Sequence, residues 1–316
     1  MPGLFAGADV GGTKAHVVVA GPDAEPLERT VATASWYTRA LPGIAAGLSE
    51  TVAALAPRGL EALVVGAHGC DTRNQCARLA RDLRERLEIP VFVFNDAELV
   101  LPAAGLSSGV GLIIGTGSIA VGYDRAGTMV TVGGWGGYLG DEGSGTGLFR
   151  DAARAVTRAF DRGVRDDPLQ SALMDVLGLQ DLRDLPARLS TELNPTAWSA
   201  LTPRLFELAL AAGSPLASDV VEASGEALAD LVKVARERGA DTRIVVPTGG
   251  VVNNAPWLRA SLEKALGRSC PETRVQYLPV APVEGALMLA GQAAAVARGD
   301  SVAGSLHPLL RDAQEH

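Results

Sequence analysis

The sequence predicts an α/β protein made of two related lobes. Its 316 residues are long for a single hydrophobic core and suit two domains. Two short glycine loops, Asp9–Lys14 and Gly115–Ser118, each follow an apolar run with the length of a β-strand. The order of strand-like and helix-like segments before the second loop is partly repeated after it. A duplicated α/β fold accounts for all of these observations.

The first half of the chain begins with strands. Residues 4–20 are typical of a strand hairpin that turns through the first glycine loop, and residues 27–34 are typical of a third strand. Apolar periodicity then predicts alternating helices and buried strands, which gives the order βββαβαβ. The expected helices are 42–56 and 75–87, and the expected strands are 63–67 and 91–94.

The second half starts with a similar pattern of strands, at 111–114, 119–123 and 129–132. We place the domain boundary between residues 104 and 105, which makes the domains 1–104 and 105–316, and we leave open that the last helix packs back on the first domain. The remaining expected elements are a helix at 146–162, unordered helices within 163–215, helices at 218–238, 256–266 and 284–296, strands at 243–247 and 275–278, and a loose tail over 300–316.

Charge and cysteine content exclude several classes of protein. The formal net charge of −8 argues against a nucleic-acid-binding protein, which needs a basic surface. Cys70, Cys76 and Cys270 are too few and too irregularly spaced for a disulfide framework, a zinc site or an iron–sulfur cluster. The N-terminus shows no leader pattern, and the longest apolar stretch, Val110–Tyr123, is too short to cross a bilayer. We therefore expect a cytoplasmic protein without nucleic-acid or membrane partners.

Both glycine loops are suited to bind anions. Glycine lets backbone N–H groups approach a ligand with no Cβ in the way, and successive N–H groups in a turn form an anion-binding concavity. Hydroxyl residues accompany both loops, which predicts that they bind one polyphosphate from two sides, as in a phosphoryl-transfer enzyme. A tight hairpin turn is the structural alternative for the second loop.

A series of short segments extends this pattern over most of the chain: Asp9–Lys14, Asn95–Ala97, Gly115–Ser118, Gly133–Gly136, Gly140–Gly145, Thr248–Val251 and Glu284–Ala286. In this order they resemble the sugar kinases of the actin, hexokinase and Hsp70 superfamily, and within it the N-acetylglucosamine kinase and BadF/BadG/BcrA/BcrD ATPase branch. The cysteine cluster of the zinc-containing ROK sugar kinases is absent from the sequence. The resemblance implies a two-lobed actin-like ATPase (ribonuclease H-like, duplicated) fold with an interlobe cleft, and ATP and Mg²⁺ as cofactors.

The resemblance also implies a nucleotide site. Asp9 is expected to hold magnesium through water, with a turn-capping aspartate as the alternative. For Lys14, a solvent-facing side chain is an equal alternative to phosphate binding. Thr248–Val251 lies where the family has its adenosine motif, and Asn253 or Asn254 is expected to reach the base or the ribose. The alternative for Asn254 is a cap of the helix that follows it. The residues expected to contact ATP are Gly11, Gly12, Thr13, Lys14, Gly115, Thr116, Gly117, Ser118, Gly249, Gly250 and Asn253.

Asp96 is the candidate catalytic base. It directly follows the strand 91–94 and Asn95, and an ordinary aspartate is ionised at neutral pH. It is therefore able to accept a proton from a sugar hydroxyl as that oxygen attacks the γ-phosphate. In the family, the matching aspartate acts on the 6-hydroxyl. A helix N-cap is the alternative role, since Ala97 and Glu98 follow.

Residues from both lobes are expected to contact the sugar. In this family the segment around Trp135 lies against the amino sugar, and Asp141 binds its hydroxyls. The alternative for Trp135 is an ordinary core tryptophan, and the alternative for Asp141 is a solvated acidic turn. For His68 the alternative is a structural histidine. The expected sugar-binding residues are Asn95, Asp96, Trp135, Gly136, Asp141, Ser35, His68 and Asp71.

One segment departs from the family. Sugar-binding relatives carry an asparagine after the third strand, and Ala34–Thr38 has none. Ser35 or Thr38 is expected to replace it, unless Trp36 and Tyr37 shape a different pocket. The identity of the sugar depends on this segment.

The function predicted from these residues is that of an ATP-dependent, magnesium-requiring kinase that phosphorylates the 6-hydroxyl of an amino sugar. N-acetylglucosamine is the favoured substrate. Glucosamine, N-acetylmuramic acid or another hexose is the alternative substrate. The other classes that we consider are an ATPase that activates a partner enzyme and a non-catalytic sugar or nucleotide sensor. Relatives of the first class carry cluster-ligating cysteines, for which this chain has no plausible pair. A homodimer is expected from the resemblance.

Overall fold

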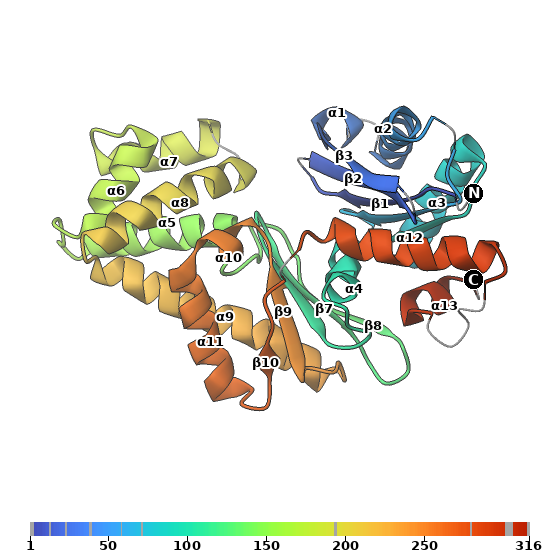
Figure 1. Ribbon diagram of the computed structural model, residues 1–316. Coiled ribbons are helices and arrows are strands. Elements are labelled where there is room, and N and C mark those ends of the chain that lie inside the picture. Colours follow the sequence, from blue (N-terminus) through green and yellow to red (C-terminus); the bar gives the residue numbers. More distant parts are fainter. Residues whose placement is uncertain are drawn as a thin grey trace. The chain divides into compact units, whose positions relative to one another are not determined.

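The structure is a computed structural model that describes residues 3–12, 14–22, 24–37, 40–57, 59–70, 72–192, 195–278, 280–300 and 306–314 (Figure 1). The chain divides into two compact units. The first unit combines Met1–Ser108 with Leu278–His316, and the second unit is Gly109–Tyr277. Compared with the expected domains, the division falls four residues later in the chain, after Ser108, and the C-terminal segment belongs to the first unit.

A five-stranded mixed sheet forms the centre of the first unit, in the order β3-β2-β1-β4-β5. The hairpin partners β1 and β2 are antiparallel, as are β2 and β3, whereas β1–β4 and β4–β5 are parallel. All of β4 is buried because it lies in the middle of the parallel part, with neighbours on both sides. The strands are β1 (Phe5–Val10), β2 (Lys14–Gly21), β3 (Ala24–Ala32), β4 (Ala62–Ala67) and β5 (Val91–Phe94).

Helices cover both faces of this sheet. Alternate residues of β1, such as Ala6 and Ala8, join a core with α2 and α3. Gly7 points the other way, and a Cβ there would collide with the backbone nitrogen of Leu287 in α12. Glycine at this position therefore lets α12 lie directly on β1. The helices of this unit are α1 (Ala34–Tyr37), α2 (Ala40–Leu55), α3 (Arg73–Leu87), the 3₁₀ turn η1 (Asp96–Leu99), α4 (Val100–Ala103), α12 (Val283–Ala297) and α13 (Pro308–Gln314).

The second unit repeats the same sheet. Its order is β10-β9-β6-β7-β8, with antiparallel β6–β7 and β7–β8 pairs and parallel β6–β9 and β9–β10 pairs. The order β8-β7-β6-β9-β10 corresponds strand by strand to β3-β2-β1-β4-β5, and equivalent neighbours pair in the same direction, antiparallel or parallel. This confirms the prediction of two related α/β halves. The strands are β6 (Val110–Ile114), β7 (Ser118–Tyr123), β8 (Met129–Gly133), β9 (Ile244–Thr248) and β10 (Arg274–Val275).

The helices of the second unit form one large core with β6. In Figure 1, α9 and α11 lie side by side, and α8 packs between α5 and α6. Ser214 caps α9 by accepting the N–H of Ala217, and Pro215 occupies its first turn. The helical elements are α5 (Gly145–Asp161), α6 (Pro168–Leu177), η2 (Leu182–Asp184), α7 (Leu185–Ala187), η3 (Arg188–Glu192), α8 (Pro195–Ala211), α9 (Pro215–Glu237), α10 (Gly250–Asn254) and α11 (Pro256–Ser269).

Three sequence expectations differ from the structure. The tail is not loose throughout, because α13 forms over Pro308–Gln314 and buries Leu309 and Leu310. The last strand is short and begins earlier than 275–278, since in the described part of the chain β10 covers Arg274 and Val275, which pair with β9. The third strand ends at Ala32, two residues before its expected end, and Ala34 already begins α1. Within the described part of the chain, every helix is too short or too polar to cross a membrane.

Candidate functional site

The first glycine loop connects β1 to β2. The N–H of Gly11 donates to the carbonyl of Lys14 at 2.9 Å, and the hydroxyl of Thr33 donates to the carbonyl of Gly11 at 3.0 Å. A Cβ at Gly12 would lie 3.6 Å from Cδ2 of His68, so this loop and the segment after β4 are neighbours. Lys14 is exposed at the start of β2, and Thr13 lies outside the described residues. The loop thus has the turn geometry expected of it.

Asp9 lies at the end of β1 in a charged environment. Its pKa is raised to about 7, chiefly by burial and also by the negative charge of Asp96, while the positive charge of Lys14 acts in the opposite direction. Burial and the nearby carboxylate both disfavour the ionised form of Asp9. A divalent cation bound beside these two carboxylates would stabilise the ionised form. Among the described residues no group of three or more His, Cys, Asp or Glu side chains is arranged to hold a metal. These residues fit Mg²⁺, which proteins bind through one or two carboxylates plus substrate phosphates.

The turn after β5 presents Asp96. Asn95 is the N-cap of η1: its side-chain oxygen accepts the N–H of Ala97 at 3.0 Å. Its side-chain nitrogen donates to the carbonyl of Cys70 at 3.4 Å, and its backbone N–H donates to Oε2 of Glu98 at 2.8 Å. The capping role considered for Asp96 therefore belongs to Asn95. Asn95 is buried and uses its amide within the protein, and its expected contact with sugar stays a prediction.

Asp96 keeps one side-chain oxygen near a titratable partner. Oδ1 accepts the N–H of Ala97 at 3.0 Å, and Oδ2 lies 3.8 Å from Nδ1 of His68. The side chain of Asp96 is 22% exposed and that of His68 is 62% exposed. The structure thus brings Asp9, His68 and Asp96 together at the ends of β1, β4 and β5, three neighbouring strands. Asp71 lies outside the described residues.

The departing segment after β3 forms the short helix α1. Ser35 is exposed there, and Trp36 packs into the core of the unit. A Cβ at Gly47 of α2 would collide with the indole ring of Trp36, so this glycine makes room for the tryptophan. Trp36 is therefore a packing residue. Thr38 lies outside the described residues.

In the second unit, backbone hydrogen bonds connect the second glycine loop to the start of α5. The N–H of Gly115 donates to the carbonyl of Gly117 at 2.9 Å, which closes the turn between β6 and β7. The carbonyls of Gly115 and Thr116 accept the N–H groups of Gly145 at 2.9 Å and Thr146 at 3.2 Å. This turn is a β-hairpin and a glycine loop at once, so the hairpin alternative does not exclude phosphate binding.

Gly249 brings the expected adenosine motif beside this loop. Its φ of 122° is a conformation that L side chains rarely adopt. A Cβ there would lie 2.5 Å from the carbonyl oxygen of Ile114 and 3.0 Å from the nitrogen of Gly115. Asn253 is exposed on α10, whereas the Asn254 side chain donates to the carbonyl of Gly250 at 2.8 Å. The cap position of α11 is Ala255, so the alternative in which Asn254 caps that helix is wrong.

Asp141 contacts the second glycine loop. Oδ1 accepts the N–H of Ser118 at 3.4 Å, and Oδ2 would lie 2.8 Å from a Cβ at Gly117. The residue has a φ of 60° and is buried, and burial raises its pKa against the lowering effect of the N–H groups of Ser118 and Gly136. Sequence reasoning missed this contact, because Asp141 and Ser118 are far apart in the chain. Nothing in the sequence indicates the positive φ of Asp141.

The segment 133–145 that contains Asp141 exposes large apolar side chains. Trp135 is 75% exposed, and Tyr138 and Leu139 are exposed to a similar degree. Nη1 of Arg150 donates to the carbonyls of Gly137 at 2.9 Å and Gly140 at 2.6 Å, which ties the segment to α5. Trp135 is therefore not a core residue, and the core alternative is wrong. Gly136, with a φ of 80°, is also exposed.

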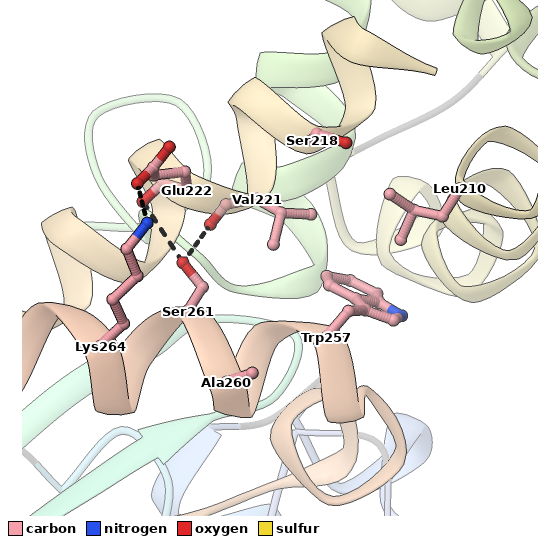
Figure 2. A pocket seen from close by; sticks show the side chains of 8 residues that line it. All are labelled: Leu210, Ser218, Val221, Glu222, Trp257, Ala260, Ser261 and Lys264. Atoms are coloured by element: carbon pink, nitrogen blue, oxygen red, sulfur yellow. Dashed lines mark hydrogen bonds and ion pairs between the residues drawn. The ribbon is translucent and has the colours of Figure 1, made fainter. Parts of the chain in front are cut away.

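A shallow hollow of about 330 Å³ lies elsewhere in the second unit, between α8, α9 and α11 (Figure 2). Trp257 forms one wall and stacks on Phe206 at 5.0 Å between ring centroids. At the other side, Nζ of Lys264 pairs with Glu222 at 2.6 Å. None of the residues that line it is among the expected site residues. The candidate site therefore rests on the strand-end loops.

Comparison with known proteins identifies the family. The BadF/BadG/BcrA/BcrD ATPase family model matches residues 6–290, which is most of the chain. The chain belongs to this family. The predicted resemblance is thereby confirmed, and ATP use follows from membership in an ATPase family.

Two curated proteins that this chain is similar to are sugar kinases. The N-acetyl-D-glucosamine kinase of Dictyostelium discoideum is 28% identical over 314 residues, covering 91% of this chain and 97% of the relative. The N-acetylmuramic acid/N-acetylglucosamine kinase of Clostridium acetobutylicum is 28% identical over 236 residues, covering 72% and 76%. A crystal structure from Chromobacterium violaceum, of a protein proposed to be an N-acetylglucosamine kinase, superposes with a TM-score of 0.71 at 22% identity and covers 90% of this chain and 98% of its own. The last likeness supports the two-lobed α/β fold.

Proposed function

We propose that the protein is an ATP-dependent kinase that phosphorylates the 6-hydroxyl of an amino sugar, with N-acetylglucosamine as its substrate. The observation that carries the proposal is the placement of Asp96 at the end of β5, partly exposed and close to Asp9 and His68, in a chain of this ATPase family. The two curated relatives support the choice of an amino sugar, since both are kinases of N-acetylated sugars.

Asp96 acts as the general base in this proposal. Oδ1 accepts the N–H of Ala97, and Oδ2, which lies 3.8 Å from Nδ1 of His68, is the proposed acceptor of the proton from the sugar hydroxyl. An ionised carboxylate is needed for this step, and a hydroxyl that loses its proton becomes a better nucleophile toward the γ-phosphate. His68 lies on the same side as Oδ2 and is expected to contact the sugar.

Asp9 is the proposed holder of the magnesium ion. When bound, Mg²⁺ neutralises the triphosphate and so lowers the barrier to attack by an oxygen nucleophile. The raised pKa of Asp9 in the free protein then falls, because a cation favours the charged carboxylate. Asp9 must be ionised to bind the metal, and this makes metal binding weaker below neutral pH.

The glycine loops are the proposed phosphate sites. In the first unit the loop residues are Gly11 and Gly12, with the exposed Lys14 beside them. In the second unit Gly115–Ser118 binds phosphate, and Gly249 and Asn253 approach the adenosine. The support is that Gly249 passes within contact distance of Gly115, so the two motifs of the second unit are neighbours. Asp141 maintains the shape of the second loop through Ser118.

A coupled ADP-release assay with ATP and magnesium tests the proposal. The sugars are N-acetylglucosamine, glucosamine, N-acetylmuramic acid, glucose and none. ADP release that increases more than about tenfold with N-acetylglucosamine alone supports it, since tenfold already corresponds to about 1.4 kcal/mol of selective transition-state binding. Equal turnover with N-acetylmuramic acid assigns the dual activity named for the Clostridium relative. Slow release that ignores every sugar refutes the kinase and favours an ATPase that acts on a partner protein.

A further inference from the structure

A buried carboxylate lies two residues after the proposed base. The Glu98 side chain is only 1% exposed. Its Oε2 accepts the backbone N–H of Asn95 at 2.8 Å, and its Oε1 lies 3.5 Å from Nη1 of Arg73, at the start of α3. Glu98 therefore connects the turn that carries Asp96 to a different element of the first unit.

A burial of this kind is costly for a helix cap alone. Removing a carboxylate from water is unfavourable unless it is paired and hydrogen-bonded. The element that Glu98 caps, η1, is a single four-residue turn. The same kind of capping box at the start of α3 uses a neutral, half-buried residue, where the N–H of Thr72 donates to Gln75 at 2.9 Å. Capping thus requires neither a charge nor full burial in this protein, and the position of Glu98 calls for another reason.

The contacts of Asn95 supply that reason. The backbone N–H of Asn95 donates to Glu98, and its side-chain nitrogen donates to the carbonyl of Cys70. The side-chain oxygen of Asn95 accepts the N–H of Ala97. The residues on both sides of Asp96 are therefore fixed, and Asp96 has little freedom to rotate its backbone. Arg73 completes the arrangement by pairing with the other oxygen of Glu98.

We propose that Glu98 is a positioning residue for Asp96: its buried carboxylate, anchored on Arg73, holds the Asn95–Ala97 turn so that the base points at the substrate hydroxyl. This inference rests on the proposed function. Glu98 does not touch substrate and transfers no proton. Its effect is on the geometry of Asp96, and a misplacement of about 1 Å at a reacting group costs on the order of 100-fold in rate.

The test compares Glu98→Ala and Glu98→Gln with the wild type. Glu98→Ala removes both contacts and is expected to lower kcat by about 10- to 100-fold, with the KM for ATP changed less than about twofold. Glu98→Gln keeps an oxygen that accepts the N–H of Asn95 but loses the charge that pairs with Arg73, so its kcat falls between the two. Glu98→Gln also keeps the test valid if Glu98→Ala does not fold.

Two further readouts separate positioning from general stability. Ser214→Ala removes the cap of α9 in the second unit and serves as the control: its melting temperature falls and its kcat does not. Amide hydrogen exchange of peptides that contain 94–98 is expected to become faster in both Glu98 variants, with ATP absent. This second readout does not require catalysis.

Each result decides something. A Glu98→Ala protein with wild-type kcat, or one in which exchange at 94–98 is unchanged, overturns the inference. A Ser214→Ala protein whose kcat falls as far as that of the Glu98 variants also overturns it, because instability then explains the loss. If the wild type phosphorylates no sugar, the proposed function fails and no base is left to position, so the inference fails with it. Faster exchange at 94–98 then shows only that Glu98 holds this turn.

Discussion

Gly249→Ala probes the link between the adenosine motif and the second glycine loop. The new methyl group would lie 2.5 Å from the Ile114 carbonyl oxygen and 3.0 Å from the Gly115 nitrogen, well inside ordinary contact distance. The φ of 122° at position 249 adds backbone strain, since non-glycine residues in such conformations cost of order 1–3 kcal/mol. The backbone must move to relieve both, and the crowded atoms belong to the end of β6 and to the loop expected to bind phosphate. We therefore expect a loss of about 1–3 kcal/mol in the stability of the second unit and weaker ATP binding.

The assay is ATP binding by calorimetry together with chemical denaturation. A tenfold or greater rise in the Kd for ATP corresponds to about 1.4 kcal/mol. Gly267→Ala is the matched control, because a Cβ there meets nothing within 4 Å and alanine favours the interior of α11. That variant should bind ATP normally and be at least as stable as the wild type. Normal ATP affinity and stability in Gly249→Ala would refute the close approach of the two motifs.

Three further predictions follow from the first unit. Asp96→Asn should abolish sugar-dependent turnover with nearly normal ATP binding, and a variant with more than about a tenth of wild-type activity would exclude Asp96 as the base, because general-base catalysis typically supplies 10²–10⁴-fold. Gly7→Ala should lower the melting temperature clearly, because the methyl group collides with the Leu287 backbone in α12, and an unchanged temperature in a thermal melt would contradict that packing. The pKa of Asp9 is raised to about 7, so its contribution to stability is present below pH 4 and is lost as the pH rises to about 7. Without magnesium, Asp9→Asn should accordingly be more stable than the wild type at pH 8, by at most a few kcal/mol in denaturant titrations, with the difference vanishing near pH 4.

The sequence predicted the architecture well for a clear physical reason. The loops at Asp9–Lys14 and Gly115–Ser118 are each flanked by apolar runs, and a tight antiparallel turn is the natural outcome of that pattern. The α12 helix was predicted, but its packing on β1 follows from Gly7, whose small size has meaning only once the two elements are known to touch. Local patterns thus predict elements, whereas the long-range contacts between them stay open.

The candidate site was predicted in its residues more than in its contacts. Asp96 was placed correctly after a strand, yet the cap of η1 is Asn95. Asp141 was assigned to the sugar from the family resemblance, and its contact with Ser118 needed the fold of segment 133–145. The sequence does not mark Glu98 as buried, because an acidic side chain early in a helix is usually solvated. Its burial is visible only when α3 packs beside the turn.

Product analysis tests the central claim most directly. The protein is incubated with ATP, magnesium and N-acetylglucosamine, and the product is examined by phosphorus–proton correlation NMR, with Asp96→Asn as the control. The account predicts a new phosphate ester whose phosphorus couples to the two protons on C6, and no such signal with the variant. Phosphorus coupled to the proton on C1, or free inorganic phosphate as the sole product, would contradict it.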